Sequence, residues 1–537
     1  MGDPDLTTRP PAWWQTGVLY QIYPRSFADS DGDGIGDLRG IASRLDYVAD
    51  LGADAIWLSP IYPSPMADFG YDIADYTDVD PLFGTLSDLD ALVAAAHGRG
   101  LRVILDLVPN HSSDEHPWFA EARASRDSPR RSWYLWHDGR GDGRPPNNWQ
   151  SVFGGPAWEW DEASGQFYLH LFDRKQPDLN WRNPEVRAAM YDVMRFWLDR
   201  GIDGFRIDVL WLLVKDAAFT DNPPPRPRVE GELEMGRYEM PAFEDLPETR
   251  AIAREMRTVA DEYDGRVLIG EIYLPLERLV AYYGERLDGV QLPFNFGLVT
   301  APRLDARSIG MLVDAYEAAL PEGAWPNWVL GNHDVPRIAT RIGPERVALA
   351  AMLLLTLRGT PTVYYGDELG MTDVPIPPEL VVDPQAASGR TRDGARTPMQ
   401  WDGGPNAGFA PEGAAPWLPV AADFSERNVA VQSADPRSPL ELFRALLRVR
   451  RAQPALVLGS YSSLDVAAEE LFAFVREHED ERVLVALNFG DQAVTADLGA
   501  AGSAGRILCA TGLDREGDVQ LGRLELAPHE GLVVRVA

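Results

Sequence analysis

The sequence predicts an α/β fold built on a (β/α)8 (TIM) barrel, because short apolar runs alternate with helical patterns along most of the chain. Eight runs have the length and the branched or aromatic composition of buried strands, at residues 17–24, 54–60, 102–110, 203–211, 267–273, 289–296, 327–334 and 360–368. Segments with apolar residues at helical spacing lie between these runs. Eight parallel strands that alternate with helices match this barrel.

An open, doubly wound sheet is the alternative fold. That fold usually has a glycine-rich phosphate turn after its first strand. Residues 24–36 contain no GxGxxG pattern, so the sequence favours the barrel.

Three stretches depart from the alternation. Residues 111–180 are rich in Trp, Gly, Pro and Asn and are too long for a loop, so they predict an inserted domain B after strand 3. Residues 216–246 and 366–437 predict long segments over the rim of the barrel. From residue 457, short alternating segments predict a C-terminal antiparallel β-sandwich. The expected domains are the barrel, the insertion and the sandwich, at residues 1–110 with 181–456, 111–180 and 457–537.

The composition is that of a globular protein with a strong negative charge. The chain has 50 Lys and Arg against 82 Asp and Glu, a formal net charge of −32 at pH 7. This charge repels nucleic acid and anionic membranes, whereas a neutral small substrate is compatible with it. Cys509 is the only cysteine, which excludes an internal disulfide. The N-terminus has no signal-peptide pattern and no apolar run is long enough to span a bilayer, so we expect a cytoplasmic protein.

Carboxylates stand at the ends of three predicted strands. Asp208 ends the fourth strand, Glu271 the fifth and Asp334 the seventh. Reacting groups of such barrels lie at the carboxyl ends of the strands, so these acids are expected to converge on one rim. Two carboxylates about 5–5.5 Å apart suit glycoside hydrolysis with retention, one as nucleophile and one as proton donor.

Motifs in a fixed order run through almost the whole chain. They include DLVPNH (106–111), QPDLNW (176–181), GFRIDV (204–209), GEIYLP (270–275), GNHDVPR (331–337) and RTPMQWD (396–402). In these motifs the sequence resembles the family 13 glycoside hydrolases of the α-amylase superfamily, and within them the oligosaccharide α-glucosidases and oligo-1,6-glucosidases. The resemblance implies a retaining, exo-acting α-glucosidase that needs no organic cofactor.

The resemblance carries roles to matching residues. It implies that Asp208 is the nucleophile that forms a β-glucosyl ester, that Glu271 is the general acid and base, and that Asp334 favours the distorted sugar. Arg206 is expected to keep Asp208 ionised, since a nearby opposite charge lowers a carboxyl pKa. The implied sugar contacts are hydrogen bonds from His111 and His333, the pair Asp68 and Arg396 on the far hydroxyls of the terminal glucose, Tyr71 on its ring, and Phe153 and Phe172 as aromatic walls.

Val209, which follows the implied nucleophile, bears on the bond cleaved. In the resembled branch, Val at this place accompanies a preference for α-1,6 bonds, and Ala or Thr a preference for α-1,4 bonds. A branched side chain narrows the space of the leaving sugar, which an α-1,6 link can swing away through its extra rotatable bond. The alternative is that Val209 only packs the end of a strand. We expect α-1,6 bonds to be preferred and α-1,4 bonds tolerated.

An acidic loop near the N-terminus predicts a cation site. Acids at alternate positions with glycines between them suit a hard cation, although position 40, where an EF-hand needs Glu, is Gly. The resemblance implies a structural calcium or magnesium ion on Asp29, Asp31, Asp33, Asp37 and the carbonyl of Ile35. An acidic turn without a metal is the alternative.

Other functions remain open. Some relatives are non-enzymatic subunits of amino-acid transporters, but those have lost the three acids that this chain keeps. Within enzymes, the alternative is a trehalose synthase or a sucrose-acting transglucosidase, because all of these share the glucosyl ester. The expected partners are small oligosaccharides such as maltose, isomaltose and sucrose-type α-glucosides, with no nucleic acid and no membrane. The sequence does not distinguish a monomer from a homo-oligomer.

Overall fold

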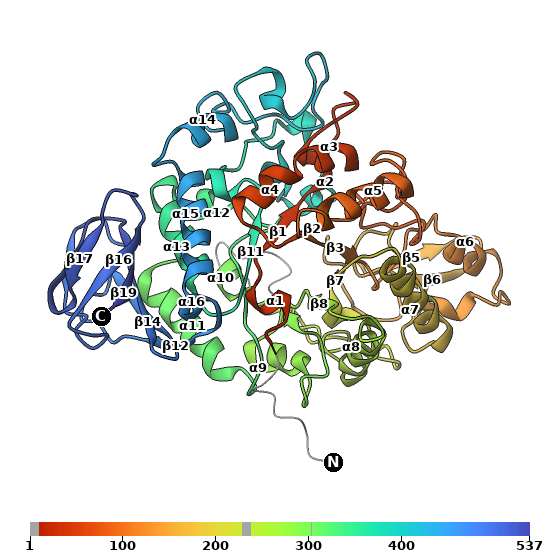
Figure 1. Cartoon of the computed structure of the whole chain (residues 1–537). Helices are drawn as coiled ribbons and strands as arrows, with labels where there is room; N and C mark the ends of the chain where they lie inside the picture. Colours follow the sequence, from red (N-terminus) through yellow and green to blue (C-terminus); the bar gives the residue numbers. More distant parts are fainter. Residues whose placement is uncertain (1–9, 228–237, 302) are drawn as a thin grey trace.

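An eight-stranded parallel sheet forms the centre of the computed structural model, which describes residues 10–227, 238–301 and 303–537 (Figure 1). The strands pair in chain order, and the last strand pairs with the first through Leu19 and Thr362. This arrangement confirms the predicted barrel. The strands are β1 (Leu19–Ile22), β2 (Ala55–Leu58), β3 (Arg102–Leu107), β7 (Gly204–Ile207), β8 (Val267–Gly270), β9 (Leu292–Pro293), β10 (Asn327–Val329) and β11 (Thr360–Tyr364).

The sheet is weakest at β9, which has two residues where the sequence predicted a strand over 289–296. Strand β9 pairs with β8 through Leu292 and Pro293. Proline has no N–H to donate, so β9 cannot extend a regular ladder on both sides. In the described part of the chain, no ladder joins β9 to β10.

Helices cover the outside of the barrel. Helix α7 shows how the sequence forms them: Asn183 caps it by accepting from the N–H of Glu185, and Pro184 is its first residue. Its buried side chains recur three and four residues apart and so form one apolar face. After β8 the helix is a single turn, α9 (Leu276–Leu279). The long helices are α5 (Leu86–His97), α7 (Pro184–Asp199), α8 (Pro247–Ala260), α11 (Ala306–Ala319), α13 (Val347–Thr356) and α15 (Pro439–Ala452), and α3 (Leu38–Ser43) and α4 (Leu45–Leu51) follow β1.

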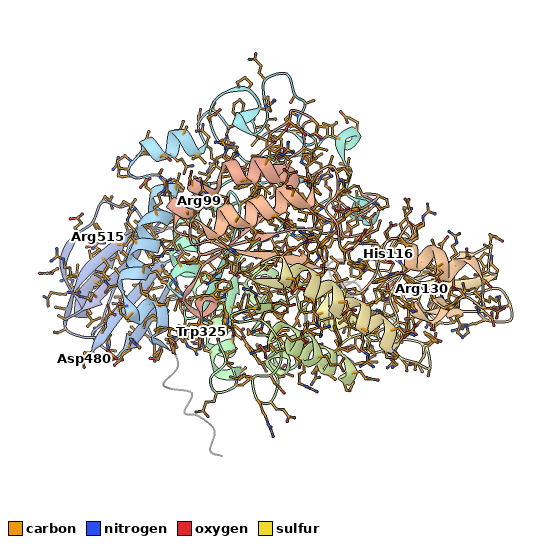
Figure 2. All side chains as sticks on the ribbon, turned by 45° about the vertical axis from the view of Figure 1, so that its right-hand side comes forward. Arg99, His116, Arg130, Trp325, Asp480 and Arg515 are labelled. Carbon is orange, nitrogen blue, oxygen red and sulfur yellow. The ribbon has the colours of Figure 1, made fainter. Side chains whose placement is uncertain are left out.

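The region between β3 and α7 projects from one side of the barrel, where Figure 2 marks His116 and Arg130. It contains α6 (Pro117–Ala124) and an antiparallel sheet of β4 (Trp136–His137), β6 (Gln166–Leu169) and β5 (Trp158–Asp161). This is the predicted insertion. Of the predicted rim segment 216–246, residues 228–237 lie outside the described residues.

Two antiparallel sheets form the C-terminal part, on the opposite side, where Figure 2 marks Asp480 and Arg515. The larger sheet contains β12 (Ser460–Ser463), β13 (Leu471–His478), β14 (Glu481–Asn488), β19 (Gly531–Val536), β16 (Ala504–Ala510) and β17 (Gly517–Gln520). The smaller sheet contains β15 (Val494–Ala496) and β18 (Leu524–Leu526). These sheets confirm the predicted β-domain, and the limits of the three domains stay predictions. Over the residues described, no helix has both the length and the apolar character needed to cross a membrane.

Candidate active site

One buried arginine gathers three carboxylates at the carboxyl ends of adjacent strands. Arg206 pairs in register with Asp106 on β3, and Asp208 and Glu271 each follow the paired residues at the ends of β7 and β8. Arg206 Nη1 lies 2.8 Å from Asp106 Oδ1 and 2.6 Å from Asp208 Oδ1, and its Nη2 lies 2.8 Å from Glu271 Oε2. The parallel register therefore brings these side chains together, as the strand-end argument predicted for Asp208 and Glu271. We call this group the Arg206 cluster.

The charges of the Arg206 cluster do not balance. Burial raises the pKa of Asp106 to about 6, against the opposing charge of Arg206. Burial likewise raises the pKa of Asp208 and of Glu271. Arg206 was expected to lower the pKa of Asp208; its charge does oppose the rise, but burial and the charge of Glu271 outweigh it. Because one guanidinium cannot balance three buried carboxylates, the cluster keeps a proton near neutral pH. A carboxyl group that is protonated near neutral pH can act as a general acid.

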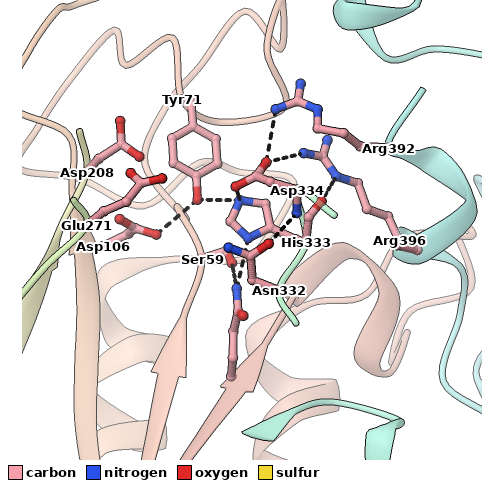
Figure 3. Close-up of polar contacts among 12 residues, drawn as sticks. Ser59, Tyr71, Asp106, Asp208, Glu271, Asn332, His333, Asp334, Arg392 and Arg396 are labelled. Atoms are coloured by element: carbon pink, nitrogen blue, oxygen red, sulfur yellow. Dashed lines mark hydrogen bonds and ion pairs between the residues drawn. The ribbon is translucent and has the colours of Figure 1, made fainter. Parts of the chain in front are cut away.

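Asp334 follows β10 and has a different environment (Figure 3). Its Oδ1 accepts hydrogen bonds from Arg392 Nη1 and Arg396 Nη2, each at 3.1 Å. Burial alone would raise the pKa of Asp334, but contacts with His333, Arg392 and Arg396 outweigh burial and lower it. Asp334 is therefore ionised beside a cluster that holds a proton.

Tyr71 connects the neighbourhood of Asp334 to the Arg206 cluster (Figure 3). Its hydroxyl donates to Asp106 Oδ2 at 3.0 Å and lies 2.8 Å from His333 Nε2. Its ring stacks on that of His333, with centroids 5.4 Å apart. Burial lowers the pKa of His333 to about 3, so the imidazole is neutral. The Gln21 amide lies 2.9 Å from His333 Nδ1, and with this amide as the donor His333 donates from Nε2 to Tyr71.

A further arginine, Arg392, lies against Asp68. The resemblance places Asp68 and Arg396 together on the terminal glucose, and in the structure Asp68 Oδ1 accepts from Arg392 Nη2 at 2.7 Å. Arg396 instead donates from Nε to the carbonyl of His333 at 2.8 Å. Arg392 precedes the 3-10 turn Asp393–Arg396 and Arg396 ends it, so the two side chains leave the turn at different places. Both arginines belong to the stretch TRDGART, and the motif alone does not distinguish them.

The insertion contributes an aromatic side to the site. The rings of Phe153 and Phe172 pack edge to face with centroids 5.8 Å apart. The guanidinium of Arg392 lies 5.5 Å from the centre of the Phe153 ring. Gln176 Nε2 donates to Asp68 Oδ2 at 3.2 Å. Side chains of the insertion therefore meet those of the segment after β11 beside Asp68.

His111 is held where the insertion joins the barrel. Its Nε2 lies 3.1 Å from the carbonyl of Tyr71, and its Nδ1 lies 3.1 Å from Asn110 Nδ2. Asn110 Oδ1 accepts at 2.7 Å from Lys215, which pairs with Asp178 at 2.6 Å. Burial lowers the pKa of His111 to about 4, so this imidazole is also neutral.

Val209 has an unusual backbone. Its φ is +37°, a rare value for a β-branched residue, and its N–H donates to Glu271 Oε2 at 2.8 Å. Strained residues of this kind cluster at functional sites. Val209 therefore fixes Glu271 through its backbone, while its side chain is buried among apolar residues.

Three residues of the site were not predicted from the sequence. Asp106 and Gln176 begin two of the recognised motifs, and Arg392 lies just before a third. A signal existed for Asp106, because a buried acid on a strand beside the Arg206 strand needs a partner. For Gln176 and Arg392 the sequence contains no such signal, since their partners lie in distant segments.

The acidic loop brings three of the four predicted acids together. Ligand oxygens of Asp29, Asp31 and Asp37 lie within 4.8 Å of one another, which fits a hard cation. Asp33 is not part of this group, and its Oδ1 accepts from the N–H of Ile35 at 2.8 Å. The three grouped acids are therefore suitable donors for calcium or magnesium, and the metal itself stays a prediction, as do Asp33 and Ile35 as its ligands.

Comparisons with known proteins match this geometry. The family model of the alpha amylase catalytic domain matches residues 21–459, and that of the maltogenic amylase C-terminal domain matches residues 461–532. A probable alpha-glucosidase of Rhizobium meliloti (strain 1021) is 42% identical over 505 residues, covering 90% of this chain and 91% of the relative. An oligo-1,6-glucosidase of Heyndrickxia coagulans is 39% identical over 527 residues, covering 90% of this chain and 93% of the relative.

Solved structures agree over nearly the whole chain. The alpha-glucosyl transfer enzyme XgtA has a TM-score of 0.92 at 41% identity, covering 98% of this chain and 100% of that chain. The trehalulose synthase MutB from Pseudomonas mesoacidophila MX-45 has a TM-score of 0.91 at 36% identity, again covering 98% of this chain and 100% of that chain.

Proposed function

Because this chain belongs to the α-amylase family of glycoside hydrolases, we propose that it is a retaining, exo-acting α-glucosidase that releases α-glucose from the non-reducing end of short α-glucosides. One observation carries the proposal: Arg206 holds Asp208 and Glu271 on its two terminal nitrogens, 2.6 and 2.8 Å away. Two carboxylates held this close, in a cluster that keeps a proton, suit a nucleophile that attacks the sugar carbon and an acid that protonates the oxygen leaving it.

The proposed reaction has two displacements at C1 of the glucose. In the first, Asp208 attacks C1, the bond from C1 to the leaving oxygen breaks, and Glu271 gives its proton to that oxygen. In the second, Glu271 takes a proton from water, the water oxygen attacks C1, and the Asp208 carboxylate leaves. Two inversions give net retention, so the glucose released in the second step is the α-anomer.

The charges support this division of roles. Asp334 is ionised, and its negative charge helps to raise the pKa of Glu271. Because this charge acts on Glu271, it favours the shared proton there, although Arg206 contacts both carboxylates and burial also raises the pKa of Asp208. Asp334 can accept hydrogen bonds from sugar hydroxyls, and these bonds strengthen as the ring becomes oxocarbenium-like.

The rim of the site supports recognition of a terminal glucose. Asp68 and Arg392 offer a carboxylate and a guanidinium to the far hydroxyls, and Phe153 and Phe172 supply apolar walls. Side chains from the insertion and from the segment after β11 meet at this point. A pocket closed here admits one glucose and favours exo-action. We also propose that α-1,6 bonds are preferred over α-1,4 bonds, because the Val209 side chain narrows the space of the leaving sugar.

Transfer of glucose to a sugar is the second candidate. The likeness to XgtA, named an alpha-glucosyl transfer enzyme, and to the trehalulose synthase MutB supports it. The glucosyl ester is common to hydrolysis and transfer, and only the acceptor differs. We propose hydrolysis as the main reaction, with transglucosylation at high sugar concentration, and a trehalose synthase or sucrose-acting transglucosidase as the alternative.

A panel of substrates tests the proposal. The purified protein is incubated with p-nitrophenyl α-glucoside, maltose, isomaltose, sucrose and trehalose, and all products are quantified by chromatography. We expect free glucose from the aryl glucoside, isomaltose and maltose. Conversion of maltose to trehalose, or of sucrose to an isomer, with little free glucose would favour the alternative.

We also propose that the loop of Asp29, Asp31 and Asp37 holds a structural calcium or magnesium ion, which would add stability without taking part in the chemistry. Removal of the ion with a chelator is expected to lower the Tm, and added calcium to restore it, while kcat at a low temperature stays the same. An unchanged Tm would contradict the site. The cytoplasmic location stays a prediction.

A further inference from the structure

We infer that Asp383, in the segment after β11, is a positioning residue that holds the guanidinium of Arg392 in place for the terminal glucose. The inference rests on the proposed function, because it assigns Arg392 to the sugar. Asp383 itself is directed at Arg392 and lies behind it, where no sugar contact is proposed.

Asp383 binds both the backbone and the side chain of Arg392. The N–H of Arg392 donates to Asp383 Oδ2 at 2.5 Å. Arg392 Nε lies 3.0 Å from both carboxylate oxygens, and Arg392 Nη2 donates to Oδ1 at 2.7 Å. The Asp383 side chain is 0% exposed. Burial would raise its pKa, but the contacts with Arg392 outweigh burial and lower it. A buried, ionised carboxylate therefore fixes one edge of this guanidinium.

The other edge of the guanidinium faces the proposed sugar site. Arg392 Nη2 also donates to Asp68 Oδ1 at 2.7 Å, and Nη1 donates to Asp334 Oδ1 at 3.1 Å. The planar fork of an arginine transmits orientation, because fixing Nε and one Nη2 hydrogen fixes the directions of the remaining donors. Asp383 thus determines where Arg392 presents its donors to Asp68, Asp334 and a sugar hydroxyl.

Asp383 is itself held in place. Its N–H and that of Val382 both donate to the buried Asp393 Oδ2, at 3.2 and 2.9 Å. Its Oδ1 accepts from the N–H of Gln385 at the start of the 3-10 turn Pro384–Ser388. Supported side chains of this kind preorganise a binding group, so that less conformational entropy is lost when the ligand binds.

The charge balance predicts what happens without this carboxylate. With Asp383 present, Arg392 divides its N–H donors among three carboxylates, so part of its attraction is directed away from Asp68 and Asp334. If Asp383 becomes neutral, Arg392 is free to turn fully onto Asp68 and Asp334. Those carboxylates would then be less available to sugar hydroxyls, and the glucose would bind more weakly.

The experiment compares Asp383→Asn with Glu379→Gln, a control that removes an exposed negative charge from the same segment. Steady-state kinetics on p-nitrophenyl α-glucoside and calorimetric titration with glucose are measured for both variants and the wild type. We expect KM and the Kd for glucose to rise roughly ten- to hundredfold in Asp383→Asn, with a smaller change in kcat, because a hydrogen-bonded charge is lost. Glu379→Gln should match the wild type.

Two further variants test the route through Arg392. In an Arg392→Lys background, Asp383→Asn should add little to the change in KM, because the two residues act as a unit. Asp383→Glu keeps the charge and should recover part of the affinity; it also tests the inference if Asp383→Asn does not fold. Unchanged glucose affinity in the folded variants, or fully additive losses with Arg392→Lys, would overturn the inference. A wild type that binds glucose but cleaves no glucoside would instead overturn the proposed function.

Discussion

Two buried arginines, each surrounded by three carboxylates, divide the candidate site. The Arg206 cluster contains Asp106, Asp208 and Glu271. A second group, the Arg392 cluster, contains Asp68, Asp334 and Asp383. The first is built on strand ends of the sheet, and the second joins loops that are distant in the sequence. The same chemical groups therefore occur on two different kinds of support.

The two clusters differ in the pKa values of their carboxyl groups. The Arg206 cluster has raised carboxyl pKa values and keeps a proton. In the Arg392 cluster, Arg396 adds a second cation and the pKa values of Asp334 and Asp383 are lowered, whereas burial raises the pKa of Asp68 to about 6 against the charge of Arg392. A protonated cluster suits acid–base chemistry, whereas fixed charges suit the binding of neutral hydroxyls. Changes in the first cluster should therefore mainly alter kcat, and changes at Arg392 and Asp383 in the second should mainly alter KM.

The largest effect is expected in the Arg206 cluster. Asp208→Asn cannot form a glucosyl ester, so kcat should fall by roughly 10⁴-fold or more on every substrate. Glu271→Gln should lose about 10²–10⁴-fold on isomaltose, and less on p-nitrophenyl α-glucoside, whose leaving group needs little protonation. Full activity in either variant, or the same loss for both leaving groups in Glu271→Gln, would remove these roles.

The next effect tests the Arg392 cluster. Arg392→Lys keeps the charge but loses the planar fork, so KM should rise roughly ten- to hundredfold with a smaller change in kcat. Arg390→Lys, two residues earlier, is the matched control. Kinetics on the aryl glucoside measure both constants. A fall in kcat with an unchanged KM would erase the distinction between the two clusters.

Val209 should give a selective effect, on one substrate relative to another rather than on all substrates alike. If its side chain limits the space of the leaving sugar, Val209→Ala and Val209→Thr should raise kcat/KM for maltose relative to isomaltose. A methyl group or two in such a pocket is worth about 10–200-fold. The measurement is the ratio of kcat/KM for maltose to kcat/KM for isomaltose in each variant and in the wild type. A wild type that prefers maltose, together with a ratio that does not move, would leave Val209 with a packing role only.

The smallest effect is a shift in the pH profile. Asp106, with a pKa raised to about 6, contributes negative charge to the Arg206 cluster. Asp106→Asn removes that charge, which lowers the pKa of the remaining pair, so the shared proton leaves at a lower pH. The alkaline limb of kcat/KM should then move down by about one pH unit. An unmoved limb, or one moved upward, would contradict the charge balance described above.

The same two clusters show what the sequence could predict. Asp208, Glu271 and Arg206 were found because strand ends of a barrel meet at one face, a rule that needs only the order of the strands. The contact between Asp68 and Arg392 was not predicted, because Arg392 and Arg396 are four residues apart on an irregular turn. Asp383 had no signal at all, since its contacts depend on loop geometry. The alternation of strands and helices in the sequence shows which strand ends are neighbours, whereas the sequence does not show the path of a loop.

The stereochemistry of the first product tests the central claim most directly. Proton NMR follows the hydrolysis of p-nitrophenyl α-glucoside, in which all the glucose formed comes from the cleaved glycosyl group, during the first minutes, before mutarotation mixes the anomers. Two displacements through an Asp208 ester predict that α-glucose appears first and the β-anomer only later. An initial burst of β-glucose would show a single displacement by water and would contradict the account.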